Sequence, residues 1–85
     1  MEIDQAIIGQ KVKSNRDFSG VPKGTDGLIV EDYNTGIKIA WDLPDKPIPK
    51  NKTPQEIAKM WAIQPECPLR DWFDKQTELQ YLDLL

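Results

Sequence analysis

The fold is decided by the stretch Gly20-Val21-Pro22-Lys23-Gly24-Thr25-Asp26-Gly27-Leu28-Ile29-Val30-Glu31. Its first half is rich in proline and glycine, which favour tight turns. Its second half is an apolar run that begins directly after Gly27. A turn-rich loop that leads at once into a short apolar strand indicates a small antiparallel β-barrel. Such barrels bind other molecules more often than they catalyse reactions.

The length and composition are those of one small globular domain, residues 1–85. The chain is 39% hydrophobic and 29% charged, which is enough for one modest core. It holds no apolar run of the roughly 18 residues that a membrane-spanning helix needs, and its first residues do not resemble a signal peptide. Cys67 is the only cysteine, so no internal disulfide can form. We therefore expect a cytoplasmic protein with no membrane contact.

The charge is unevenly distributed along the chain. The net charge is −3: residues 1–52 carry eight basic and eight acidic side chains, whereas residues 53–85 carry three basic and six acidic ones. A nucleic-acid-binding protein usually has a clear basic surplus, because neutralised phosphates supply much of its affinity. We interpret the one local surplus as a solvated strand edge and loop or, alternatively, as an anion or nucleic-acid patch, formed by Lys11, Lys13, Arg16 and Lys23.

The front of the chain predicts three strands, at residues 10–14, 28–31 and 37–41. Val12 alternates with outward lysines in the first strand, and alternate apolar residues share one face of the third. Gly27 suits either close backbone packing or a positive φ. The hairpin turn at residues 32–36 is expected to place Asn34 and Gly36 in left-handed conformations.

Residues 42–68 predict an ordered, proline-rich insertion between the third and fourth strands. Six of the seven prolines lie between Pro44 and Pro68. Within this segment, Thr53-Pro54-Gln55-Glu56 has the pattern of a helix start, with an N-cap threonine, a proline at the first helical position and a capping-box glutamate. We expect one helix at residues 54–62, lying over an open end of the barrel.

The C-terminal segment allows two interpretations. The first is a strand at residues 69–73, a single helical turn at 74–79 and a last strand at 80–84. The second is one amphipathic helix over residues 71–85, because Trp72, Leu79 and Leu82 have tolerable helical spacing.

The chain resembles a bacterial SH3-like barrel. The resemblance rests on the long loop with Val21-Pro22-Lys23-Gly24-Thr25-Asp26-Gly27, on Ile39-Ala40-Trp41-Asp42, and on Asp74-Lys75-Gln76-Thr77-Glu78-Leu79 before a final apolar strand. It covers residues 8–41 and 69–85, and the insertion departs from it. It implies a mainly β, five-stranded barrel, with one short α-helix in an insertion between strands 3 and 4. The aromatic, acidic groove of peptide-binding SH3 domains is not matched residue by residue, so no site residue is carried over.

The sequence holds no recognisable catalytic or cofactor motif. The absence of histidine excludes Ser-His-Asp and Cys-His catalysis and the usual zinc sites. No glycine-rich phosphate loop occurs. We interpret the carboxylate pairs Asp42/Asp45 and Asp71/Asp74 as turn caps, and we expect no enzyme activity, no cofactor and no metal.

The aromatic residues carry the remaining functional signal. They are either core fillers, since a small barrel needs bulky side chains, or anchors for a partner. Trp72 and Phe73 are adjacent, so in a strand they must face opposite sides of the sheet. We predict a non-catalytic protein-protein interaction module or accessory subunit with a basic partner, and a nucleic-acid-binding barrel as the alternative. The candidate partner-binding residues are Tyr33, Trp41, Trp61, Trp72, Asp71 and Asp74.

Overall fold

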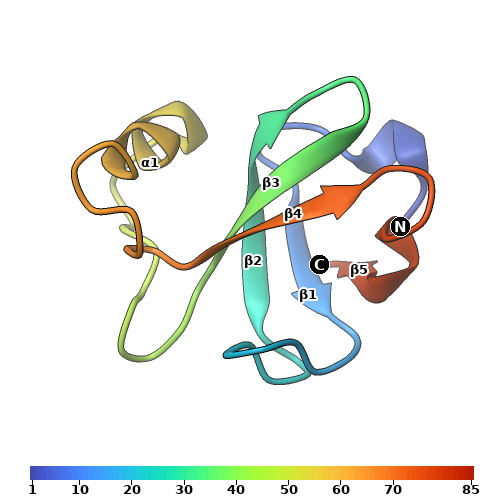
Figure 1. The fold of residues 1–85 in the computed structure, drawn as a ribbon, viewed down its shortest axis with the longest axis horizontal. Helices are drawn as coiled ribbons and strands as arrows, with labels where there is room; N and C mark the ends of the chain where they lie inside the picture. The colour runs from blue at the N-terminus through green and yellow to red at the C-terminus, as the bar shows by residue number, and fades with distance from the viewer.

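A computed structural model describes all 85 residues and contains one curled antiparallel sheet (Figure 1). Its five strands form a half-barrel in the order β4-β3-β2-β1-β5. The strands are β1 (Lys11–Ser14), β2 (Asp26–Asp32), β3 (Gly36–Trp41), β4 (Arg70–Asp74) and β5 (Leu82–Leu84). One α-helix, α1 (Pro54–Met60), lies between β3 and β4 in the chain, and short 3₁₀ helices span Ile3–Gln5 and Leu79–Tyr81. The prediction of a mainly β protein with five strands and one helix is confirmed.

The inner face of the sheet holds the main core. Ile37, Ile39 and Trp41 of β3 are fully buried there, as their alternation along the strand predicts. Gly27 on β2 is required by close packing, because a Cβ at this position would lie 2.8 Å from the Ile39 side chain and 2.9 Å from the Trp41 ring. Phe18 reaches this core from the β1–β2 loop and packs against Trp41.

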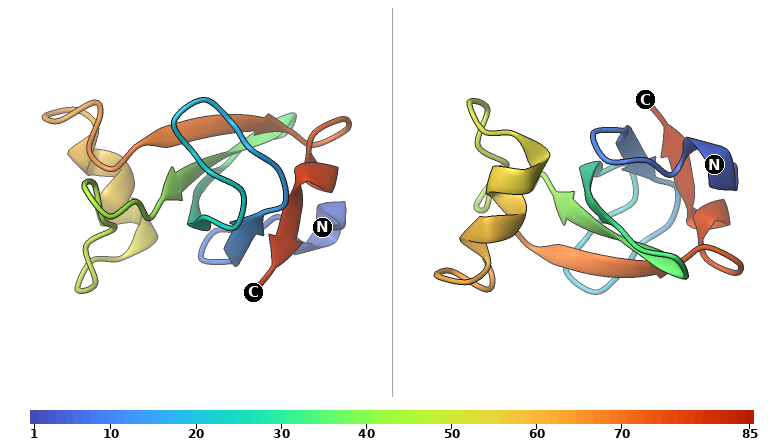
Figure 2. Two further views of the ribbon diagram at one scale, coloured as in Figure 1. Left: turned by 90° about the horizontal axis from the view of Figure 1, so that it is seen from below. Right: turned by 90° about the horizontal axis from the view of Figure 1, so that it is seen from above.

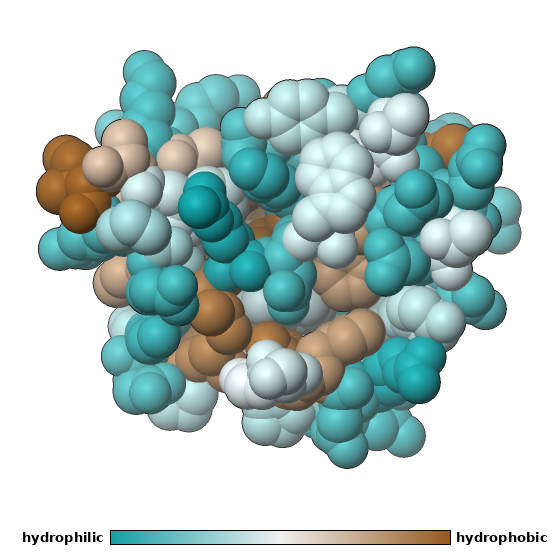
Figure 3. All heavy atoms as spheres, viewed as in Figure 1, coloured by the Kyte–Doolittle hydropathy of each residue, from teal (hydrophilic) through white to brown (hydrophobic).

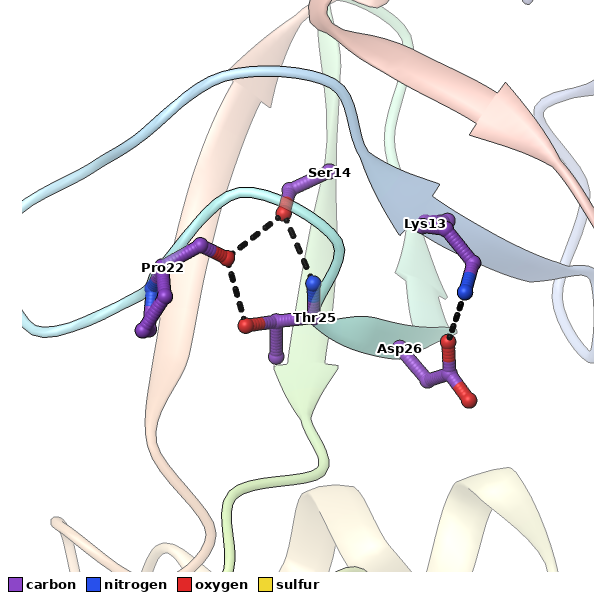
Figure 4. Close-up of polar contacts among 5 residues, drawn as sticks. All are labelled: Lys13, Ser14, Pro22, Thr25 and Asp26. Carbon is purple, nitrogen blue, oxygen red and sulfur yellow. Dashed lines mark hydrogen bonds and ion pairs between the residues drawn. The ribbon is translucent and has the colours of Figure 1, made fainter.

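The β1–β2 loop is fastened to the end of β1 by hydrogen bonds (Figure 4). The buried Ser14 Oγ donates to the Pro22 carbonyl at 3.0 Å and accepts from the Thr25 N–H at 3.1 Å. The Thr25 hydroxyl donates to the same carbonyl at 2.6 Å. Gly24 takes a φ of 88°, which explains the glycine in this turn. The loop is therefore an ordered part of the scaffold.

A second, smaller core lies on the outer face of the sheet. Ile57 and Trp61 from α1 and its C-terminal end pack against Val30 of β2 and Ala40 of β3. Val30 lies on the same outer face as Leu28 by the alternation of the strand, and the shift in the β2–β3 register after Ile29 places Glu31 opposite Lys38. We expected the helix to cover an open end of the barrel; instead it covers part of this outer face, because its apolar side chains meet a matching apolar patch.

The helix begins as the sequence predicts. The Thr53 side chain accepts from the Glu56 N–H at 3.2 Å, and Glu56 accepts from the Thr53 N–H at 2.9 Å, which completes the capping box. The helix ends at Met60, two residues before the predicted end, and turns follow it.

Of the two interpretations of the C-terminal segment, the one with two strands is confirmed, because β4 pairs with β3 and β5 pairs with β1. The single helix over residues 71–85 therefore does not form. The expected left-handed conformations in the hairpin turn are wrong. Neither Asn34 nor Gly36 takes a positive φ in the β2–β3 hairpin.

The N-terminus, for which we predicted no element, is held against the last strand by its amino group, which donates to the Leu82 carbonyl at 3.0 Å. No helix in the structure combines the length and the apolar character that crossing a membrane requires.

Candidate functional site

Two exposed aromatic side chains lie together on the outer face of the sheet. Tyr33 in the β2–β3 hairpin is 44% exposed, and Trp72 in β4 is 43% exposed. Their ring centroids lie 5.7 Å apart with the planes tilted by 38°. We call this pair the aromatic face. Both residues were predicted as partner contacts, and the structure brings them together although they lie far apart in the sequence.

The sheet geometry places Trp72 outside. Its neighbour Phe73 is buried in the main core, so Trp72 must point the other way, as we predicted from their adjacency. Trp72 pairs with Lys38 across the β3–β4 ladder, and its ring lies directly over Gly36. A Cβ on Gly36 would come within 2.2 Å of the ring, so only glycine allows this position.

The position of Tyr33 is fixed by a side chain of β2. Its hydroxyl donates to Glu31 at 2.6 Å, and the other oxygen of Glu31 lies 3.8 Å from the Lys38 amino group. The hydrogen bond to the Glu31 carboxylate raises the pKa of Tyr33, because it favours the protonated phenol. This hydrogen bond therefore fixes the Tyr33 ring beside Trp72.

A groove of about 400 Å³ runs beside the aromatic face. Its lining comes from β2, the β2–β3 hairpin, α1 and the N-terminal segment, and it combines apolar and charged side chains. In Figure 3, which shows the face of Figure 1, pale side chains cross the upper middle and brown apolar atoms show in the hollows between hydrophilic ones. The groove is lined by Ile8, Val30, Glu31, Asp32, Tyr33, Gln55, Ala58 and Lys59.

Trp41 and Trp61 are not available to a partner. Trp41 is fully buried in the main core, and Trp61 is 4% exposed under the insertion. Each indole N–H is satisfied within the chain: Trp41 donates to Asp71 at 2.7 Å, and Trp61 donates to the Pro68 carbonyl at 2.9 Å. Arg70 stacks over the Trp61 ring at 5.0 Å. The prediction that these two residues contact a partner is corrected, because their rings fill the two cores.

The two predicted acidic residues of β4 differ in their surroundings. Asp74 ends the strand, and its Oδ1 accepts from the backbone N–H groups of Gln76 and Thr77, at 2.8 and 3.2 Å, so it caps the following turn. Asp71 is half-buried beside Trp41 and Phe73, and burial raises the pKa of its carboxyl, with a smaller contribution from Glu78.

The four basic residues of the alternative patch are partly engaged elsewhere. Lys13 forms an ion pair with Asp26 at 3.3 Å (Figure 4). The Arg16 guanidinium lies over the Tyr81 ring at 4.4 Å. Lys11 is exposed on β1, and Lys23 is exposed in the β1–β2 loop. The structure therefore gives two of these charges partners within the chain.

Sequence reasoning missed the groove beside the aromatic face. Ile8 and Ala58 line it from segments fifty residues apart, and neither carries a local signal beyond being apolar.

No cluster of three or more acidic, cysteine or histidine side chains is arranged to hold a metal ion. No family model, curated protein or solved structure matches this chain.

Proposed function

We propose that this protein is a non-catalytic protein-binding module, or an accessory subunit of a larger complex, built on an SH3-like barrel. The single observation that carries the proposal is the aromatic face. Tyr33 and Trp72 are large, fixed and exposed, and neither fills a core. Tyrosine and tryptophan held in this way are typical anchors of protein interfaces, because they bury much area with little loss of side-chain entropy.

Four further features support the details of this proposal. The 3₁₀ helix directly before β5 and the long ordered β1–β2 loop fit the SH3-like resemblance. The single cysteine, Cys67, fits a reducing cytoplasm. The acidic surplus of residues 53–85 favours a basic partner, since complementary charge accelerates association and excludes acidic competitors.

The proposal is tested by binding experiments with single substitutions at the aromatic face. The tagged protein is used to capture partners from cells of its native host, and the affinity of each captured partner is then measured with purified components. Tyr33→Ala and Trp72→Ala should each weaken binding by about tenfold or more, as expected for interface anchors.

Ile63→Ala is the matched control, because Ile63 is 85% exposed and lies outside this surface. A partner that binds all three variants as tightly as the unchanged protein would remove the aromatic face as the binding site. Circular dichroism of each variant establishes that it is folded.

A further inference from the structure

The β4 strand leaves one edge of the sheet open. It is the terminal strand in the sheet order, with β3 as its only neighbour. The Trp41 N–H donates to the Leu69 carbonyl at 2.8 Å, and the Lys75 N–H donates to the Thr35 carbonyl at 2.9 Å. Hydrogen-bonded pairs alternate along an antiparallel ladder, so the backbone groups of Arg70 and Trp72 point away from β3. These groups form a short, unpaired strand edge.

A groove of about 240 Å³ lies along this strand. The β1–β2 loop forms its opposite wall, and the left view of Figure 2 shows this loop passing close to β4. The groove has aromatic walls and two carboxylates but no basic side chain. We call it the seam, and its lining is Phe18, Ser19, Asp71, Trp72, Phe73 and Glu78.

Each of the two carboxylates in the seam is fixed by one oxygen and free at the other. Asp71 accepts the Trp41 indole N–H with Oδ2, and Glu78 accepts the Asp74 backbone N–H with Oε1 at 2.8 Å. No hydrogen bond or ion pair within the chain reaches Asp71 Oδ1 or Glu78 Oε2. Lys75, which lies nearby in sequence, is paired with Asp32 instead. The seam thus presents two oriented acceptors whose negative charge no cation of this chain neutralises.

We propose that the seam binds an extended segment of a partner protein, which adds a strand to the β4 edge and places an arginine within reach of Asp71 and Glu78. Backbone pairing with an open edge supplies affinity that does not depend on sequence, and the side-chain pockets supply specificity. Arginine fits better than lysine, because its planar guanidinium bonds to carboxylates and stacks on aromatic rings such as Phe18.

The alternation of side chains along a strand predicts which residues should flank the arginine in the partner segment. Asp71 points to the inner side of β4 and Trp72 to the outer side, so the arginine and its two neighbours in the added strand face opposite sides. One neighbour would lie beside Trp72 and the other beside the aliphatic stem of Arg70, whose guanidinium lies over the Trp61 ring, so both should be apolar. The partner segment is thus an extended apolar–arginine–apolar sequence. This inference rests on the proposed function, since it names the partner chemistry of a surface that shares Trp72.

The seam is tested with synthetic peptides and nuclear magnetic resonance of the full chain. The probe is the acetylated and amidated peptide Thr-Thr-Val-Arg-Val-Thr-Thr, titrated to about 5 mM, which detects millimolar binding. Two control peptides carry glutamate in place of arginine or N-methylated valines that cannot pair with a strand edge. The reporters are the Trp41 indole N–H, which donates to Asp71, and the Trp72 backbone amide.

The arginine peptide should shift both reporters, and both control peptides should bind about tenfold more weakly or not at all. Asp71→Asn and Glu78→Gln should each weaken the arginine peptide by about tenfold, because each removes a charge-assisted hydrogen bond. Asp45→Asn and Glu66→Gln are the matched controls, since both residues are exposed in the insertion and should leave binding unchanged.

Three results would overturn the inference: unshifted reporters, equal binding of the arginine and glutamate peptides, or binding that survives both seam substitutions. If the Trp72 amide shifts with protein concentration alone, the edge pairs with a second copy of the chain, and the assignment of a partner segment is wrong. Partner capture that depends on Tyr33 but not on Asp71 or Glu78 would retain the proposed function and reject the seam as its peptide site.

Discussion

Replacement of Gly36 by alanine should push the Trp72 ring out of the aromatic face. The added Cβ would lie 2.2 Å from Cζ2 and 2.5 Å from Cε2 of the ring. Non-bonded carbons pack at about 3.5 Å or more, so the ring must withdraw by about 1.3 Å. The backbone of Gly36 has no left-handed φ, so alanine itself fits the strand conformation. The perturbation therefore acts on the contact with Trp72 rather than on the backbone dihedrals.

The expected change in stability follows from two opposing effects. Overpacking of this kind destabilises a folded protein by about 1–3 kcal/mol. Replacing glycine by alanine within a strand restores about 0.5–1 kcal/mol, because the unfolded chain loses conformational freedom. We expect Gly36→Ala to lower the free energy of unfolding by about 1 kcal/mol, within a range of about 0–2.5 kcal/mol, and to weaken partner binding because Trp72 leaves its position beside Tyr33.

A double-mutant cycle with Trp72→Ala isolates the clash. Urea denaturation is followed by the fluorescence of Trp41 and Trp61, which are buried and remain in every variant. The Phe73 carbonyl lies 2.7 Å from the same added Cβ, but it is present in both backgrounds, so its effect cancels. The coupling energy should be about 1 kcal/mol or more. An equal loss of stability in both backgrounds would refute the reasoning, because the methyl group would then not act through the Trp72 ring.

Three further outcomes are expected. Thr53→Ala should lower the free energy of unfolding by about 1 kcal/mol in urea denaturation, because it removes the N-cap of α1. Thr53→Ser should retain most of this stabilising free energy. Because the folded state raises the pKa of Asp71 above the usual 3.8, it binds this proton more tightly than the unfolded chain does. The free energy of unfolding should therefore fall as the pH rises from the usual pKa of Asp71 through its raised pKa. Asp71→Asn should flatten this part of a curve of stability measured from about pH 4 to about pH 7. Single- and double-stranded oligonucleotides should not bind at about 50 mM salt, where electrostatic affinity is high; binding that disappears on substitution of the basic residues would instead assign a nucleic-acid site to Lys11, Lys13, Arg16 and Lys23.

The features that the sequence predicted well are those with local causes. The start of α1 follows from four consecutive residues, Thr53-Pro54-Gln55-Glu56, whose hydrogen bonds close within one turn. The opposite orientation of Trp72 and Phe73 follows from the two-residue period of a strand. The strand positions follow from alternation and from the turn residues between them, so their ends differ by only one or two residues from the prediction.

The exposure of each tryptophan could not be predicted, because it depends on contacts between distant segments. Trp41 is buried since Phe18 and Phe73 pack against it from a loop and another strand. Trp61 is buried since the insertion folds back onto the outer face of β2 and β3. Alternation along β3 groups Trp41 with Ile37 and Ile39, but the sequence does not show which distant residues cover that face.

The close-packed glycines illustrate the same limit. Gly36 was expected to supply a left-handed turn, but its role is to leave space for the Trp72 ring from another strand. Composition alone does not distinguish these two uses of glycine, because both require the absence of Cβ. The distinction needs the identity of the residue that approaches, which only the β3–β4 register provides.

The two halves of the outer face show why the aromatic face differs from an ordinary patch of exposed apolar residues. Toward the start of the insertion, Val30 and Ala40 are covered by Ile57 and Trp61 of the insertion, so this half forms a core. At the hairpin end, the larger rings of Tyr33 and Trp72 lie on the same face but are left uncovered. The hydrophobic effect alone would favour covering the larger rings first, because they bury more area. In this protein the smaller side chains are covered instead. The Tyr33 ring is held by a hydrogen bond to Glu31, and the Trp72 ring lies over Gly36. This arrangement fits a surface kept open for a partner.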